Sequence, residues 1–374
     1  MSRYPALLAL VLLPLVTAPA LGQTSGTTLS PTDETEATRV ATRGANFLSL
    51  PVGARAQALG GAYTAIASGV SALYWNTAAI AFDERIRIGG SLSNLYDDLD
   101  VQHIFAGFIL PVGFNRFAVS LNQLSSGDIV RTDFEFPEGG NPQFGETFEW
   151  SATAVGLHYA RLVTDRLAVG VAGKFINEGI PGADADFFAG DIGVQFETGI
   201  LATRLAAAFF NLGSDSHVDG ALVRRRVEQS SLVERTGTLD TRRTLDIGLL
   251  TNEVELPTGF RFGIATDLVG RAEALLGPSG MHRFQAMLDV ADGTDTPLSP
   301  TVGLEYSFRD ILYLRGGKRW ANEEQISRDF SHLLSFGGGL AVPLPGGRRL
   351  MFDYAFTDAG DLQNVQSFAL ELAF

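Results

Sequence analysis

The chain has 374 residues, no cysteine and a formal net charge of −14, with 45% hydrophobic residues and only 19% charged ones. The lack of cysteine excludes disulfides, thiol catalysis and cysteine metal ligands. The acidic balance, without a basic stripe along the chain, excludes a nucleic-acid surface.

The first 22 residues have the pattern of a secretory signal peptide, because a basic start at Arg3 precedes an apolar run that ends in small residues. The run is shorter than the roughly 20 residues of a spanning helix. Pro14 and Pro19 also interrupt it. We expect residues 1–22 to be cleaved during export. Residues 23–42, rich in Thr, Ser and Glu, should then form a flexible periplasmic segment.

Residues 43–84, here named the plug, have the pattern of a compact and partly helical unit. The stretch Asn46–Phe82 consists of small residues and short apolar runs, with turn-prone glycines at Gly60 and Gly61, and it lacks the alternation of a strand. Strand-like segments follow it to the end of the chain. Two arrangements agree with this order: a plug inside a barrel, or a small helical cap on a soluble β domain.

From residue 85 to residue 374 the sequence repeats segments of about ten residues in which apolar and polar side chains alternate. Lipid admits only helices or closed barrels, since unpaired backbone groups are costly there, and this spacing is typical of transmembrane barrels. Charged side chains are costly toward lipid, so we expect those at alternate positions to face the lumen. These positions include Lys174, Glu305, Asp353 and Glu371.

A soluble β-sandwich also shows alternation. The barrel is favoured by the export signal, by strand faces crowded with Phe, Leu, Val and Tyr, and by the terminal aromatic Phe374. Bacterial single-chain barrels have even strand numbers, whereas the pattern contains an odd number of segments. We assign residues 242–251 to an outer insertion. The fold prediction is an all-β transmembrane barrel of about 14 antiparallel strands on residues 85–374, with the plug in its lumen.

Three short motifs lie in the plug: the Pro51-Val-Gly-Ala-Arg55 turn, the Leu59-Gly-Gly-Ala62 run and the Leu73-Tyr-Trp-Asn76 segment. With these motifs the chain resembles the N-terminal hatch of the PorV/PorQ family of outer-membrane proteins, relatives of the FadL-type fatty-acid transporters. Relatives usually continue Asn-Pro-Ala, whereas this chain has Thr77 in place of the proline, so its local turn is less rigid. The resemblance covers nearly the whole mature chain and implies a FadL-like barrel.

The PorV/PorQ resemblance implies a non-catalytic part in protein export by the type IX secretion system, with substrates received or handed over at the cell surface. Its partners would be secretion components or exported proteins, beside outer-membrane lipid and lipopolysaccharide. The alternative is FadL-like passive transport of hydrophobic small molecules or fatty acids, in which an apolar ligand leaves through a break in the wall. Glycines weaken a strand, so the expected lateral opening is at Gly337, Gly338 and Gly339.

The sequence contains no recognisable catalytic, metal or cofactor motif. Its five histidines are spread over different segments without paired spacing. His158 is expected to face the lumen, but no serine or carboxylate can be placed beside it from the pattern. The pair Gly60–Gly61 lacks the following lysine of a phosphate-binding loop. We therefore expect no enzymatic activity, no metal and no cofactor.

One charged constellation follows from the strand pattern. Antiparallel pairing around the turn at Arg309–Asp310 sets Glu305 opposite Arg315 on the lumen face, where the pair can stabilise the wall. A wider set of polar residues is expected to hold the plug. On the wall these are Lys174, Glu305, Arg315, Arg319, Asp353 and Glu371, and in the plug they are Arg55, Gln57 and Asn76.

Two long loops, near residues 125–147 and 213–256, are expected at the outer side. The first combines aromatic and acidic residues, and the second contains a run of basic residues. Such surfaces suit recognition of a partner, contact with lipopolysaccharide or packing between the loops. The residues concerned are Phe134, Phe136 and Phe144 in the first loop, and Arg224, Arg225 and Arg226 in the second.

Overall fold

The computed structural model describes residues 43–95, 100–132, 134–141, 147–229, 243–294, 298–320, 333–358 and 364–374. The expected signal peptide at 1–22 and the segment 23–42 lie outside the described residues. Within these ranges, no helix is long and apolar enough to cross a membrane.

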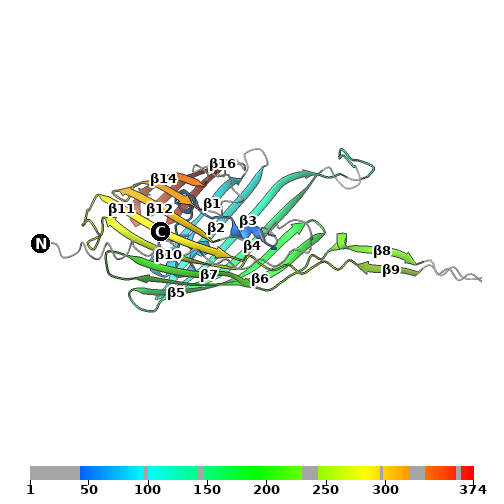
Figure 1. Cartoon of the computed structure of the whole chain (residues 1–374), viewed down its shortest axis with the longest axis horizontal. Coiled ribbons are helices and arrows are strands. Elements are labelled where there is room, and N and C mark those ends of the chain that lie inside the picture. Colours follow the sequence, from blue (N-terminus) through cyan, green and yellow to red (C-terminus); the bar gives the residue numbers. More distant parts are fainter. Residues whose placement is uncertain are drawn as a thin grey trace, which may run out of the picture. The chain divides into compact units, whose positions relative to one another are not determined.

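Fourteen antiparallel strands of the described chain close into a barrel (Figure 1). The first strand, β1 (Arg87–Leu95), pairs with β2 on one side and with the last strand, β16 (Asn364–Ala373), on the other. This pairing closes the ring and confirms the predicted fold.

The other twelve strands of the ring run in sequence order between these two, each antiparallel to its neighbours. They are β2 (Val101–Val112), β3 (Asn115–Val130), β4 (Thr147–Leu162), β5 (Leu167–Ile180), β6 (Ala183–Glu197), β7 (Arg204–Gly213), β10 (Gly259–Val269), β11 (His282–Gly293), β12 (Ser299–Phe308), β13 (Leu312–Arg319), β14 (Leu334–Pro343) and β15 (Arg349–Asp358).

Two further strands lie outside the ring. β8 (Arg224–Gln229) and β9 (Arg243–Gly248) form a two-stranded ribbon in the long connection between β7 and β10, and the ribbon projects from one end of the barrel (Figure 1). The segment 242–251 therefore does not contribute a strand to the barrel. We name this end the loop end. The opposite end, with the tight turns β2–β3, β4–β5 and β12–β13, is the short-turn end.

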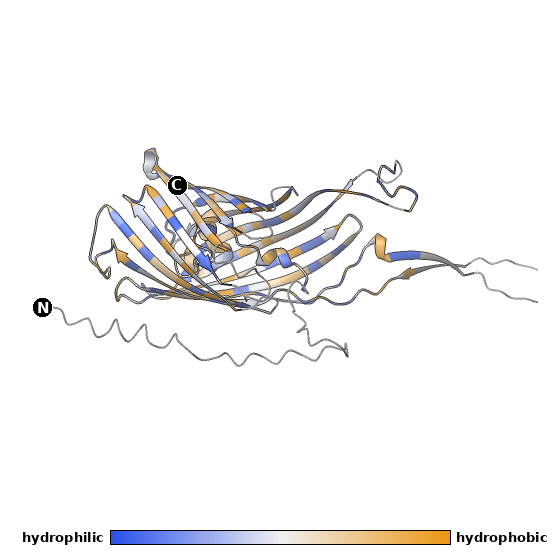
Figure 2. Cartoon of the chain, turned by 45° about the horizontal axis from the view of Figure 1, so that its top comes forward, coloured by the Kyte–Doolittle hydropathy of each residue, from blue (hydrophilic) through white to orange (hydrophobic). Residues whose placement is uncertain are grey.

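The outer surface of the barrel is apolar because each strand exposes every second side chain there. β6 shows the pattern clearly, with buried and exposed residues alternating along almost its whole length. Hydrophobic and hydrophilic residues alternate along the strands in Figure 2. Exposed side chains on this surface include Phe108, Phe117, Phe175, Leu304, Phe352 and Leu370.

The plug occupies the lumen as four short helical segments, η1 (Asn46–Ser49), α2 (Ala54–Ala58), α3 (Ala72–Trp75) and η2 (Thr77–Phe82). Helix α2 packs against β13, β14, β15 and β16, and η2 packs against β3, β4, β5 and β6. Small and apolar plug residues, with Tyr63 and Trp75 as the large members, join inward residues of the wall in one buried cluster. The partly helical plug in the lumen is thus as predicted.

Glycines in the wall allow the plug to approach the strand backbone. A Cβ atom at Gly170 on β5 would lie 2.5 Å from the backbone nitrogen of Ala78, and one at Gly337 on β14 would lie 2.5 Å from the Cβ of Ala58. Real Cβ atoms do not come this close, so any larger residue would displace the plug. The small residues on both sides are therefore a requirement of packing.

Replacing Gly170 with valine should loosen the plug, because the added atoms have no space between β5 and Ala78. Overpacking of this kind costs roughly 1–3 kcal/mol. Gly173→Val on the same strand is the matched control, since an added Cβ there meets nothing within 4 Å. The measurement is the rate of protease cleavage within the plug of the folded protein. Equal rates for the two variants would contradict the packing argument.

Candidate functional site between plug and barrel

A charged network joins helix α2 to the barrel wall. Arg55 donates from Nε to Glu305 Oε2 and from Nη2 to Glu305 Oε1, both at 2.8 Å. Glu305 also accepts from Arg315 Nε at 2.6 Å, and Arg315 Nη1 donates to Asp353 Oδ1 at 2.6 Å. The strand register sets Glu305 opposite Arg315, which is the pairing expected from the turn at Arg309–Asp310. One carboxylate is thus shared between a plug arginine and a wall arginine.

Because the network is buried, the loss of one of its members lowers the stability of the folded protein. Glu305 and Arg315 are only 3% and 5% exposed. Removing one member of a buried ion pair leaves an uncompensated charge and costs about 3–5 kcal/mol. Burial by itself would lower the pKa of Arg55, but the adjacent Glu305 carboxylate raises that pKa well above its ordinary value. The plug arginine therefore stays charged.

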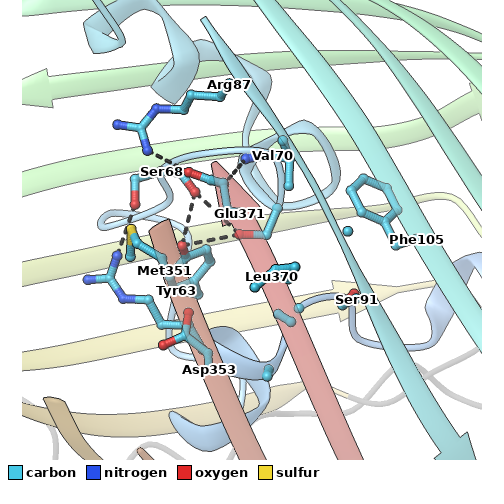
Figure 3. Close-up of a pocket in the computed structure, with 16 residues that line it drawn as sticks. Tyr63, Ser68, Val70, Arg87, Ser91, Phe105, Met351, Asp353, Leu370 and Glu371 are labelled. Atoms are coloured by element: carbon cyan, nitrogen blue, oxygen red, sulfur yellow. Dashed lines mark hydrogen bonds and ion pairs between the residues drawn. The ribbon is translucent and has the colours of Figure 1, made fainter. Parts of the chain in front are cut away.

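Glu371 on β16 contacts the plug at a second place (Figure 3). Its Oε2 accepts from the backbone nitrogen of Val70 at 2.8 Å, and its Oε1 accepts from Arg87 Nη1 at 2.6 Å. Arg87 Nε lies 2.8 Å from Oδ1 of Asp83, which directly follows η2. A cavity of about 40 Å³ is lined by residues of both charged networks, including Arg55 and Glu371.

Asp83 is a buried carboxyl group at the end of the plug. Its Oδ2 has no hydrogen-bond partner among the described residues. Burial raises the pKa of Asp83 to about 6, while Arg87 acts in the opposite direction and Glu371 adds to the rise. Ionising Asp83 therefore costs more free energy in the folded protein than in the unfolded chain.

Two further plug residues expected at the wall make neutral hydrogen bonds there. Gln57 donates from Nε2 to Ser93 Oγ at 2.9 Å and accepts at Oε1 from Ser367 Oγ at 2.6 Å. Asn76 donates from Nδ2 to the carbonyl of Val194 at 3.2 Å, and its Oδ1 caps the following helical turn. These contacts attach the plug to β1, β16 and β6.

Arg319 and Lys174, both expected to hold the plug, have different surroundings. Arg319 Nε donates to the carbonyl of Gly60 in the plug at 3.2 Å. Lys174 Nζ lies 2.6 Å from Asp191 Oδ2 and donates to Asn211 Oδ1 at 2.9 Å. These partners are on β6 and β7, so Lys174 connects strands of the wall. Its contact with the plug stays a prediction, and its partner Asp191 could not be identified from the sequence.

The wall is closed in this structure at Gly337, Gly338 and Gly339, where the lateral opening is expected, so the opening stays a prediction. All three residues are paired with β13 on one side and with β15 on the other, in one continuous register. Gly337 leaves space for Ala58 of the plug. A Cβ at Gly339 would lie 2.8 Å from Arg315 Nη1. These glycines make room for the plug and the charged network.

A cavity of about 120 Å³, named the outer cavity, lies over the plug at the loop end. The guanidinium carbon of Arg261 on β10 lies 4.6, 4.7 and 4.2 Å from the ring centres of Tyr74, Trp75 and Phe210, which all line the cavity. Arg261 Nη1 donates to the Tyr74 carbonyl at 3.1 Å. Aromatic faces attract a guanidinium, so the rings hold Arg261 at the cavity wall.

Phe210 belongs to this group through its pairing with Gly259 on β10, and a β-bulge directly follows it. The register between β6 and β7 shifts after Gly190, and Asn211 has a left-handed φ of 56°. The backbone nitrogen of Asn211 donates to the Asp191 side chain at 2.9 Å in place of a strand partner. On the β10 side the register is regular: Phe209 pairs with Phe260 on the exposed outer surface, whereas Phe210 pairs with buried Gly259 and lies beside Arg261.

A second cavity of about 120 Å³ shares Pro51 and Arg319 with the outer cavity. We name it the apolar cavity, since its lining includes Leu50, Leu95, Leu333 and Val365. Among the described residues, neither Arg261 nor Arg319 forms an ion pair with a carboxylate. Apolar surface and two guanidinium groups therefore meet over the plug.

The outer cavity was missed in the sequence, although a signal was present. Arg261 occupies an inward position in the alternating segment Gly259–Val269. The alternation that places Glu305 in the lumen applies to Arg261 as well. What the pattern cannot supply is which plug residues meet Arg261.

His158 has partners that the sequence did not reveal. Its Nε2 lies 2.8 Å from Ser120 Oγ, and its Nδ1 lies 3.1 Å from Oγ1 of Thr77 in the plug. In the described chain no carboxylate bonds to the imidazole. Ser120, His158 and Thr77 therefore lack the carboxylate of a catalytic triad, and His158 forms a further contact between wall and plug.

The outer-loop residues do not form one surface in the described chain. Phe134 is fully exposed, Phe136 is partly buried, and Phe144 and the side chain of Arg226 lie outside the description. Arg224 Nη2 lies 3.1 Å from Asp219 Oδ2 in its own connection, and Arg225 is exposed. The recognition role of these loops stays a prediction.

No family model and no curated protein matches the chain. Among solved structures, the Pseudomonas putida toluene transporter TodX aligns at 13% identity with a TM-score of 0.50, covering 86% of this chain and 96% of that one. The CymD monoaromatic hydrocarbon channel aligns at 11% identity with a TM-score of 0.51 over the same shares. The likeness is one of fold. The PorV/PorQ resemblance is not shown by these comparisons.

Arg55→Gln should weaken the attachment of the plug, because Glu305 then keeps only Arg315 as an ionic partner. Loss of one member of a buried pair is expected to cost about 3–5 kcal/mol. Protease cleavage of the plug in the folded protein measures the effect, with exposed Arg225→Gln on the ribbon as the control. Unchanged resistance in Arg55→Gln would show that the network does not hold the plug.

The attachment of the plug should strengthen as pH falls from neutral toward 5. The pKa of Asp83 is about 6 when folded and 3.8 ordinarily, so the folded state binds more protons between these values. Stability from this group is therefore lost as pH rises through about 6. Thermal unfolding between pH 5 and pH 7.5 tests this, and Asp83→Asn should have the smaller pH dependence. Parallel curves for both proteins would refute the assignment.

Proposed function

We propose that the protein is an outer-membrane channel for the passive passage of hydrophobic small molecules. The observation that carries the proposal is a pair of cavities over the plug that share Pro51 and Arg319, one lined by Tyr74, Trp75 and Phe210 and the other by aliphatic residues. Concave sites with apolar and aromatic walls and few polar groups are the usual form of small-molecule sites. A likeness of fold to the toluene transporter TodX and the CymD hydrocarbon channel supports it.

The location in the outer membrane follows from the surface of the barrel. A closed ring with an apolar exterior satisfies all backbone groups in lipid, as a bilayer requires. Barrels of this kind carry short turns toward the periplasm and longer loops outside. The short-turn end would then face the periplasm, and the outer cavity would open toward the cell surface. Export through the signal at residues 1–22 belongs to the same proposal.

The chemistry of the cavities suggests two kinds of ligand. A hydrocarbon or a simple aromatic compound would need only the apolar walls. A fatty acid would in addition place its carboxylate near Arg319, which lines both cavities, while its chain lies along Leu50, Leu95 and Val365. A guanidinium without an ionic partner in the described chain is suited to such a headgroup.

The secretion role that the PorV/PorQ resemblance implies has no support of this kind. No family model matches the chain, and two solved structures of similar fold are a toluene transporter and a monoaromatic hydrocarbon channel. Passive uptake, the alternative in the sequence analysis, therefore becomes the leading proposal. A secretion partner or an exported protein would be expected to engage the loop end.

Passage requires the plug to rearrange or the wall to open. The contacts of Arg55 with Glu305 and of Val70 with Glu371 oppose any movement of the plug. A ligand can shift the position of the plug only through a difference in its affinity for the two states. The channel is therefore expected to be closed at rest.

Native mass spectrometry of protein extracted from its own membrane in mild detergent tests the proposal. We expect a retained apolar ligand and no stoichiometric protein partner. Added decanoate should bind. Arg319→Gln should weaken decanoate binding on the order of tenfold or more, since the carboxylate then loses a charged hydrogen bond to the guanidinium. Binding of decanol, which has no charge, should be unaffected by the substitution.

One result would overturn the proposal. An empty lumen together with a stoichiometric protein partner would favour the secretion role over passive uptake. Equal loss of decanoate and decanol in Arg319→Gln would show that the substitution disturbs the cavity as a whole. Trp75→Phe reports on the position, because a ligand in the outer cavity should change the fluorescence of the native protein and not of this variant.

A further inference from the structure

The long connection between β10 and β11 is a folded structure at the short-turn end, remote from the ribbon in Figure 1. Its backbone returns to the end of β10, where Leu275 N donates to the Asp267 carbonyl at 3.1 Å and Leu276 N to the Leu268 carbonyl at 2.8 Å. Beside it lies a pocket of about 270 Å³ that we name the Arg271 pocket. Its lining includes Arg271, Ser279, His282, Arg283 and Arg309.

Behind this pocket, one carboxylate is shared by three arginines. Asp267 is completely buried, and it lies 3.3 Å from Arg204, 3.4 Å from Arg271 and 3.0 Å from Arg283. A single carboxylate neutralises only one of these three charges. Arg271 has a second acidic neighbour, Glu197, but the nitrogen–oxygen distance is 3.6 Å. Positive charge therefore exceeds negative charge at this place, in a chain whose net charge is −14.

The excess charge is accessible at the short-turn end. The side chains of Arg271 and Arg283 are 44% and 30% exposed. Arg309 in the β12–β13 turn adds a third guanidinium, whose contacts in the described chain are the Phe308 ring and the sulfur of Met281. The one carboxylate in the described lining, Asp310, accepts from Ser307 Oγ at 3.4 Å.

Ser279 supplies a neutral donor at the same place. Its Oγ accepts from the backbone nitrogens of His282 at 3.1 Å and of Met281 at 3.4 Å. Because both bonds use the oxygen as acceptor, the hydroxyl hydrogen remains available for a ligand. The neighbouring residue, Gly280, has no side chain to block the approach.

We infer that the Arg271 pocket binds a phosphate group. Guanidinium forks match phosphate oxygens, and three of them here come from separate segments: the connection, β11 and the β12–β13 turn. A tetrahedral phosphate can accept from three directions, whereas a carboxylate has two oxygens in one plane. The phosphate can belong to the headgroup of a phospholipid in the inner leaflet or to a soluble phosphate compound. This inference does not depend on the proposed channel function.

Binding of inorganic phosphate to the full-length protein, measured by isothermal titration calorimetry in a phosphate-free detergent, tests the inference. The double variant Arg271→Gln with Arg309→Gln should weaken binding on the order of tenfold or more, because it loses charged hydrogen bonds. Arg283 is left in place because it holds Asp267. Arg161→Gln, an exposed arginine on β4, is the matched control and should bind as the native protein does.

Arg309→Gln alone covers the case in which the double variant does not fold, since the guanidinium of Arg309 contacts the Phe308 ring and the Met281 sulfur and not Asp267 in the described chain. Native mass spectrometry separates the two sources. Phosphatidylglycerol that stays bound and is displaced by inorganic phosphate identifies a lipid headgroup, whereas phosphate binding without retained lipid identifies a soluble compound. The inference is overturned if the native protein does not bind phosphate, or if the double variant binds phosphate as tightly as the native protein does. Acetate binding as tight as phosphate overturns it in favour of an acidic peptide.

Discussion

Glu305 is the residue on which the plug and the barrel depend together. A carboxylate in the lumen wall, shielded from water, is stable only with good ionic partners. One of its two partners, Arg315, also holds Asp353, and the other, Arg55, belongs to the plug. A barrel without its plug would therefore leave Glu305 underpaired. The same residue that attaches the plug makes the empty barrel unfavourable, so plug and wall form one stable unit.

That attachment works only because the backbones are in contact. Arg55 lies on a helix of one and a half turns, and a longer distance to β12 would place Glu305 beyond the reach of its fork. Gly317 and Gly337 remove side chains where Leu59 and Ala58 approach the wall. Close packing and ion pairing are therefore not separate contributions. The glycines allow the plug to lie close to the wall, and the ion pair between Arg55 and Glu305 requires that short distance.

Alternation made much of this fold predictable from the sequence. Period two is a local property, so it assigns each strand residue to the lumen or to the lipid, and a tight turn then sets the register of Glu305 against Arg315. Which plug residue meets which wall residue depends on contacts between distant segments. Lys174 shows the limit: its inward position followed from the pattern, but its partner Asp191 depends on the pairing of β5 with β6.

Glycine and bulge positions show why the rest was not predictable. A run such as Gly337–Gly339 is compatible with a weak strand and equally with close packing, and only the neighbours Ala58 and Arg315 distinguish them. The bulge at Asn211 likewise arises from one side chain, Asp191, replacing a strand partner. No local pattern predicts either event.

Arginine suits position 319 for a physical reason that also bears on the plug. Arg319 lines both cavities and already donates to Gly60, at the end of the helix that carries Arg55. A guanidinium has five N–H donors, so an anion can bind Arg319 without displacing Gly60. A lysine ammonium has only three N–H donors to share between the Gly60 carbonyl and an anion. Occupation of the cavities therefore need not release the plug, and its release has to overcome the ion pair at Glu305.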